Sequence, residues 1–288
     1  MKRNAIIMAA GTSSRFLPIS YEYPKAFLKV KGEILIERQI SQLKEAGIQD
    51  ITIIVGYKAE QFQYLEKKFD VQLVYNCDYS IYNNTSSLIR VLDKLKNTFI
   101  CSSDNYFSQN VFIEQTDFSY YSAIYQEGKT SEYCLTYNQN NEITKVEIGG
   151  ENSYVMLGHV YFTEDFSKQF IDILKKEYQL EENRKKLWEQ IYMEHLDKLI
   201  LKIKKYPKNI IYEFDSLDEL RQFENNFDSN SKILKEISNF FHCKEKELSN
   251  FTKKENTETI FSFYFCYRGE KYVYELEKIE NKFNIALV

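Results

Sequence analysis

A polar loop near the start of the chain carries the residue types that bind phosphate. The apolar run Ala5–Ala10 has the length of a strand and leads into a Gly/Thr/Ser turn, which Arg15 follows. Such a turn offers backbone N–H groups to an anion, and Lys25, ten residues further on behind two prolines, adds a second cation. Together these residues predict a binding site for a nucleoside triphosphate. Its candidate nucleotide-binding residues are Ala10, Gly11, Thr12, Ser13, Ser14 and Arg15.

The first half of the chain alternates strand-like and helix-like segments around this loop. Strands are expected at Ala5–Ala10, Ile51–Val55, Val71–Tyr75 and Thr98–Cys101, and helices at Ile34–Ala46, Ala59–Phe69 and Ser86–Leu95. This alternation predicts an α/β fold of the doubly wound class, with a mostly parallel sheet covered on both faces. Ligands of such sheets bind beyond the carboxyl ends of the strands, which is where Gly11–Arg15 and Asp104 fall.

The rest of the chain predicts an extension and a separate appendage. Extended pieces at Ser122–Tyr125, Cys134–Tyr137 and Val155–Phe162 favour an antiparallel or mixed extension over the nucleotide site. Further elements are expected at Phe166–Tyr178, Leu187–Ile203 and Leu217–Phe227 (helices) and at Ile210–Asp215 (strand).

A polar stretch, 225–231, is typical of a linker and predicts two domains, residues 1–230 and 231–288. The second is expected to be a small α+β unit, with a helix at Ile233–Phe241 and a hairpin of Ile260–Tyr267 and Lys271–Leu276.

Composition excludes several functional classes. The 38 basic and 42 acidic side chains are well mixed and give a net charge of −4, so no broad basic surface for nucleic acid is expected. No apolar stretch approaches the roughly 20 residues of a membrane span, and no signal peptide is recognisable, which predicts a cytoplasmic protein. The five cysteines form no C-x-x-C pair, so neither a zinc site nor a disulfide framework is indicated.

The motifs, taken in order, resemble those of nucleotidyltransferases that make nucleoside-diphosphate sugars and amino alcohols. The matching segments include Ala9–Arg15, Pro24-Lys25, Asn83–Leu88, Ser103–Tyr106 and Tyr212–Ser216. Their order is similar to that of bacterial CTP:phosphocholine cytidylyltransferases of the choline-incorporation pathway, over residues 1 to 225. One departure is Ser13, where the family at large usually has a second glycine.

This resemblance implies a Rossmann-like nucleotidyltransferase fold and assigns roles to individual residues. Lys25, Arg15 and Asp104 would be catalytic. Asp104 and Glu213 would hold Mg²⁺, the implied cofactor, with Asp215 as a near alternative to Glu213. Asn84 and Ser86 are candidates for a nucleotide-facing loop.

The acceptor pocket is the part of the resemblance that is incomplete. Proteins surround a quaternary ammonium with aromatic faces and add a carboxylate. Tyr133 falls at the family's aromatic wall and Glu189 at its carboxylate, whereas Leu187 stands where a second aromatic side chain is expected. Aromatic residues that could complete the pocket are Tyr154, Tyr161, Trp188 and Tyr192.

The reaction implied is transfer of CMP from CTP to phosphocholine, with phosphoethanolamine or 2-aminoethylphosphonate as alternative acceptors. A sugar-1-phosphate nucleotidyltransferase and a non-catalytic nucleotide-binding module remain open, as does the oligomeric state. Residues 231–288 weakly resemble the N-terminal part of a choline-kinase small lobe but are too few for a kinase. The chain is then a shortened relative of a kinase fusion or a fragment of one, or the likeness is accidental.

Overall fold

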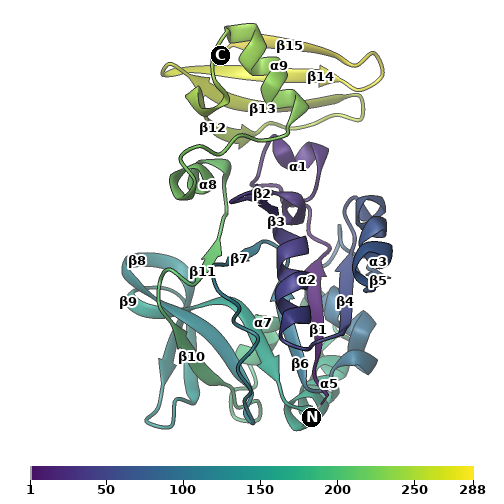
Figure 1. Cartoon of the computed structure of the whole chain (residues 1–288), viewed down its shortest axis with the longest axis vertical. Coiled ribbons are helices and arrows are strands. Elements are labelled where there is room, and N and C mark those ends of the chain that lie inside the picture. The colour runs from purple at the N-terminus through teal and green to yellow at the C-terminus, as the bar shows by residue number, and fades with distance from the viewer. Residues whose placement is uncertain (1) are drawn as a thin grey trace. The chain divides into compact units, whose positions relative to one another are not determined.

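The computed structural model describes residues 2–288, which form two compact units (Figure 1). The first unit comprises residues 2–11 and 35–213, and the second comprises residues 12–34 and 214–288. Residues 214–231 thus share a unit with the C-terminal residues, while the predicted domain boundary at residue 230 stays a prediction.

A seven-stranded sheet forms the centre of the first unit. Its strands, in spatial order, are β10 (Lys202–Tyr206), β8 (Tyr120–Tyr137), β9 (Ile143–Phe162), β6 (Thr98–Ser102), β1 (Asn4–Ala9), β4 (Asp50–Val55) and β5 (Gln72–Tyr75). β1 pairs parallel with β4 and β6, β4 with β5, and β10 with β8, whereas β9 is antiparallel to both of its neighbours. The predicted α/β fold with a mostly parallel sheet is confirmed.

The helices of this unit follow from apolar spacing and capping. They are α2 (Leu35–Glu45), η2 (Ala59–Phe62), α3 (Gln63–Phe69), α4 (Thr85–Leu88), η3 (Ile89–Lys94), α5 (Glu164–Glu177), α6 (Glu181–Arg184) and α7 (Trp188–Met193). α2 buries Leu35, Ile36, Ile40 and Leu43, an i, i+4 pattern that marks one face. α5 begins where the Thr163 side chain accepts a hydrogen bond from the N–H of Phe166.

The extended pieces predicted for the middle of the chain are confirmed and pair antiparallel, but they are parts of two strands, β8 and β9, that are longer than expected. Register shifts at several bulges interrupt the strict alternation that a sequence pattern needs. The helix expected over Leu187–Ile203 ends at Met193, and its last part becomes β10, because Lys202–Tyr206 pairs alongside β8. Likewise α8 (Leu217–Phe223) stops short of Phe227.

A second small sheet in the first unit joins β7 (Asn105–Phe107) to β11 (Ile211–Glu213) in antiparallel register. Gly158 allows this arrangement, since a Cβ atom there would lie 2.9 Å from Ile211 Cγ2. Its φ of +94° also favours glycine. The close approach of β9 and β11 therefore depends on a residue without a side chain.

The second unit contains the segment after the polar loop and the C-terminal part of the chain. Its elements are α1 (Ile19–Glu22), η1 (Lys25–Phe27), β2 (Lys29–Val30), β3 (Glu33–Ile34), α8, α9 (Lys232–Phe241), η4 (Glu245–Glu247), β12 (Leu248–Lys253), β13 (Ile260–Tyr267), β14 (Glu270–Glu277) and β15 (Lys282–Leu287). The last four strands form an antiparallel sheet in sequence order, and α9 lies across one face of it (Figure 1). The predicted helix and hairpin are confirmed, and the pattern missed the two outer strands.

No helix among residues 2–288 combines the length and the apolar character that a membrane span requires. The cytoplasmic location stays a prediction.

Candidate active site

The polar loop after β1 turns at Ser13. This residue has a φ of +53°, and its carbonyl accepts a hydrogen bond of 2.9 Å from the N–H of Phe16. Left-handed backbone is the conformation that glycine adopts without strain and that costs other L-residues about 1 kcal/mol. The preference for a second glycine in the resembled family therefore has a conformational reason, and Ser13 retains the turn without it.

The two predicted cations meet at one carboxylate within the second unit. Arg15 Nη1 lies 2.7 Å from Asp215 Oδ2, and Lys25 Nζ lies 3.8 Å from Asp215 Oδ1. Lys25 is only 7% exposed, and its ammonium group sits 5.7 Å from the centre of the Phe16 ring. Arg15 and Lys25 thus lie close to each other, and their convergence on a triphosphate stays a prediction. Asp215, weighed above as an alternative metal ligand, is the residue that holds them.

Asp104 and Glu213 are brought together by the pairing of β7 with β11 in the first unit. Glu213 stands opposite Asn105 in the register, and Asn105 Nδ2 donates a hydrogen bond of 3.3 Å to Glu213 Oε2. Asp104 immediately precedes Asn105 and is partly exposed. Two carboxylates at one strand end are a donor set that suits Mg²⁺ once phosphate oxygens and water complete the coordination. The described residues include no larger cluster of His, Cys, Asp and Glu.

Glu189, in the first turn of α7, is held by two neutral donors. Asn84 Nδ2 donates to Glu189 Oε2 at 3.2 Å, and the Tyr121 hydroxyl donates to Oε1 at 3.3 Å. Asn84 also accepts a 2.7 Å hydrogen bond from the N–H of Trp188, so it ties the loop before α4 to the start of α7. The Trp188 ring stacks on Tyr121, with centroids 5.8 Å apart and planes 14° apart.

Burial gives the Glu189 carboxyl an unusually high pKa. It raises the pKa of Glu189 from 4.5 to about 7, although the hydrogen bonds from Asn84 and Tyr121 act in the opposite direction. The pKa of Tyr133 is raised by burial and then by the negative charge of Glu189, so these two groups interact electrostatically. Because both hydrogen-bonding partners are neutral, a cationic ligand would stabilise the ionised form.

Of two further predicted tyrosines, Tyr161 lies on the other face of the sheet, and a part of Tyr154 in acceptor binding stays a prediction. Tyr161 is 3% exposed and packs on Phe99 and Tyr120, with ring centroids 4.8 and 5.9 Å away. Tyr161 pairs with Tyr120 across the two strands, so the two side chains lie on the same face of the sheet. Tyr121 is the next residue of the strand and therefore points to the opposite face. Tyr154 packs on Tyr125 and Tyr137 and receives the ammonium of Lys205 over its ring. Both rings thus have structural contacts that do not include Glu189.

Three further candidates have structural roles. Trp188 and Tyr192 are fully buried in the core below α7 and cannot face a ligand. Ser86 is also fully buried, and its hydroxyl donates to the Asn83 carbonyl and accepts from Asn76, which argues against the predicted nucleotide contact.

Tyr121 is the pocket residue that the sequence analysis missed. It supplies both a hydroxyl and a ring next to Glu189, yet its neighbour Tyr120 has the same residue type. Strand alternation would have shown only that the two rings face opposite sides, and not which side holds the site.

Comparison with known proteins shows which family the chain belongs to. A model of the MobA-like NTP transferase domain matches residues 5–116. Choline-phosphate cytidylyltransferase from Streptococcus pneumoniae is 34% identical over 220 residues, which cover 76% of this chain and 96% of that protein. The chain belongs to the choline-phosphate cytidylyltransferase family. A solved structure of CTP:phosphocholine cytidylyltransferase from Streptococcus pneumoniae superimposes with a TM-score of 0.76 at 33% identity, covering 78% of this chain and 99% of that one.

Membership of the cytidylyltransferase family makes the chain a nucleotidyltransferase but leaves the acceptor to be argued from the pocket. The 2-aminoethylphosphonate cytidylyltransferase of Lancefieldella rimae is 33% identical over 230 residues, covering 78% of this chain and 94% of that protein. Two relatives with different acceptors in their names are therefore almost equally similar. About a quarter of this cytidylyltransferase chain lies outside each alignment.

The raised pKa of Glu189 predicts how its replacement changes stability with pH. The folded protein binds this proton more tightly than the unfolded chain, so ionisation lowers the free energy of unfolding by about 3 kcal/mol as pH rises from 4.5 through 7. Glu189→Gln cannot ionise and escapes this loss. Its free energy of unfolding relative to the wild type should therefore increase by about 2 to 3 kcal/mol between pH 5 and pH 8 in urea titrations.

Glu182→Gln, on the exposed face of α6, is the matched control and should follow the wild-type pH profile. A Glu189→Gln variant whose stability parallels the wild type at both pH values would contradict the burial of a titrating carboxyl.

Proposed function

We propose that this enzyme transfers CMP from CTP to phosphocholine, which gives CDP-choline and pyrophosphate. The observation that carries the proposal is the Glu189 carboxyl, which accepts hydrogen bonds from Asn84 and from the hydroxyl of the aromatic residue Tyr121, and whose charge raises the pKa of Tyr133. A carboxylate beside aromatic rings is the environment that recognises a quaternary ammonium. The relatives named for choline phosphate or phosphocholine support the same acceptor.

In the proposed reaction, an acceptor phosphate oxygen attacks the α-phosphorus of CTP in line. The new P–O bond forms as the bond to pyrophosphate breaks, without a covalent enzyme intermediate. The backbone of Gly11–Ser14 and Arg15 would bind the β- and γ-phosphates, and Lys25 would offset the charge on the α-phosphoryl group. Because Asp215 pairs with both cations, the triphosphate must compete with this carboxylate for them.

Asp104 and Glu213 would hold Mg²⁺, which neutralises charge on the phosphate oxygens when bound. The chain's own contribution is to fix the position of the Glu213 carboxylate. The hydrogen bond from Asn105 and the strand register do this before any ligand arrives.

The arrangement around Glu189 favours a quaternary over a primary ammonium. Each oxygen of Glu189 already accepts one hydrogen bond, which leaves fewer acceptor positions for the N–H groups of a primary ammonium. A trimethylammonium group needs charge and ring faces and donates no strong hydrogen bond. Leu187, which stands where a second aromatic wall is expected, keeps 2-aminoethylphosphonate as the second candidate.

An acceptor panel tests the proposed function. Pyrophosphate release from CTP with Mg²⁺ should give a kcat/KM at least about tenfold higher with phosphocholine than with phosphoethanolamine or 2-aminoethylphosphonate, a difference of 1.4 kcal/mol. Glucose-1-phosphate should give no product with CTP, UTP or dTTP. A preference for the phosphonate or the sugar phosphate would overturn the choice of acceptor. CTP binding without product from any acceptor would support a non-catalytic module.

Asp104→Asn tests the metal assignment, because it removes the charge and keeps the shape of the side chain. We expect kcat to fall by about 100-fold or more while the melting temperature stays close to that of the wild type. The exposed Asp197→Asn serves as the control and should keep wild-type turnover. Near-normal kcat in Asp104→Asn at saturating Mg²⁺ would remove Asp104 from the metal site.

A further inference from the structure

Residues 232–288, here called the appendage, pack on the helix that follows the phosphate-binding loop. Both belong to the second unit, which includes Thr12 to Ile34 and the chain from Phe214 onward. The ring of Tyr21, in α1, stacks on the ring of Phe261 in β13, with centroids 3.7 Å apart and planes 13° apart. Phe261 is only 2% exposed. The appendage thus buries the Phe261 side chain against α1, the helix that follows the phosphate-binding loop.

A polar contact fixes the same two parts of the chain. The N–H of Lys232, at the first position of α9, donates a 2.8 Å hydrogen bond to Glu22 Oε1 at the end of α1. A free N–H in the first turn of a helix is one of the groups that need an external acceptor. Glu22 therefore acts as a partner of the N-terminus of α9, while the Ser231 side chain caps the N–H of Leu234.

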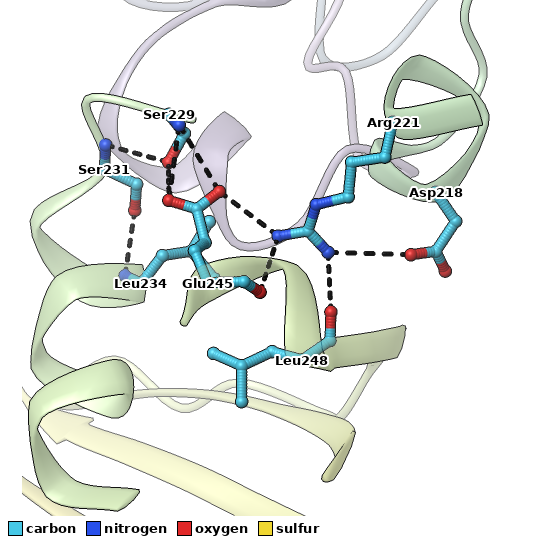
Figure 2. A network of polar contacts seen from close by, with 7 residues as sticks. All are labelled: Asp218, Arg221, Ser229, Ser231, Leu234, Glu245 and Leu248. Atoms are coloured by element: carbon cyan, nitrogen blue, oxygen red, sulfur yellow. Dashed lines mark hydrogen bonds and ion pairs between the residues drawn. The ribbon is translucent and has the colours of Figure 1, made fainter. Parts of the chain in front are cut away.

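The appendage also makes polar contacts with α8, the helix that follows Asp215 in the chain. Figure 2 shows Arg221, in α8, reaching both Glu245 and the carbonyl of Leu248. Arg221 Nη2 lies 3.1 Å from Glu245 Oε1, and the two side chains are only 11% and 8% exposed. The Ser229 hydroxyl donates to Glu245 Oε2 at 2.8 Å.

This network fixes part of the stretch 225–231, which the sequence predicts to be a linker. Its irregular backbone agrees with the predicted linker, but Ser229 and Ser231 are buried and hydrogen-bonded (Figure 2). The stretch connects α8 to the appendage through fixed contacts. Because α8 begins two residues after Asp215, the partner of Arg15 and Lys25, these contacts also restrain the cation cluster.

We propose that the appendage positions the phosphate-binding loop for the nucleotide. The four residues of α1 are too few to form a stable helix alone, so its geometry depends on tertiary contacts. Tyr21 and Glu22 supply these contacts, and Arg15 precedes them by six and seven positions in the chain. A loop ordered in advance pays less conformational entropy when the ligand binds. This proposal rests on the proposed function only in taking CTP as the ligand.

Tyr21→Ala in the full chain tests this positioning role. Losing the stack should raise KM for CTP about fivefold to tenfold, with kcat within about twofold and the acceptor KM unchanged. Tyr21→Phe keeps the ring and should restore the wild-type KM.

Phe241→Ala is the matched control, because its ring packs on Tyr267 and Tyr272 inside the appendage, with centroids 4.7 and 4.8 Å away. It should lower the melting temperature and leave KM for CTP at the wild-type value. If KM for CTP rises equally in Phe241→Ala and Tyr21→Ala, general destabilisation explains the increase, and the proposal is overturned.

Amide hydrogen exchange of residues 12–22 in the ligand-free protein separates this inference from the proposed function. Tyr21→Ala should accelerate exchange in this segment, and Phe241→Ala should not. If no acceptor gives product, the proposed function fails while the exchange result still judges the positioning role. Unchanged exchange together with an unchanged KM for CTP in Tyr21→Ala would overturn it.

Discussion

The carboxyl of Glu189 imposes the main electrostatic constraint on the acceptor side of this enzyme. Its burial raises its pKa to about 7, and the side chains that donate hydrogen bonds to it at 3.2 and 3.3 Å, an amide and a phenol, carry no charge. Keeping such a group ionisable costs folding free energy, which a hydrophobic side chain at that position would not require. That cost has a functional explanation when a cationic substrate binds there, because the substrate supplies the missing positive charge.

On the nucleotide side, too, a charged ligand would replace a contact within the protein. Asp215 forms ion pairs with both Arg15 and Lys25, and its negative charge reduces the repulsion between these two cations. A triphosphate carries more charge than one carboxylate and can displace it. The appendage extends this principle to the backbone, since Tyr21 and Glu22 give the short helix α1 contacts that its own sequence cannot provide.

The features that could be predicted from sequence are those with strong local patterns. The apolar run before Gly11 predicted strand β1, which is confirmed, and the positions of Arg15 and Lys25 predicted two cations near each other. For Asp104 and Glu213 the family resemblance, and no local pattern, implied a shared site, and their role in metal binding stays a prediction. The extent of β8 and β9 could not be predicted, because bulges break the alternation of buried and exposed residues. Tyr121 and the wrongly assigned Tyr161 show the same difficulty, since sheet faces are decided by tertiary packing.

The central claim is that Glu189 recognises the positive charge of the acceptor, and a neutral analogue tests it most directly. In 3,3-dimethylbutyl phosphate a carbon atom replaces the choline nitrogen, so the shape is kept and the charge is lost. We predict that wild-type kcat/KM falls by about tenfold to 100-fold from phosphocholine to this analogue at pH 8, and that Glu189→Gln abolishes most of the difference. Equal kcat/KM values for the two acceptors in the wild type would contradict the account.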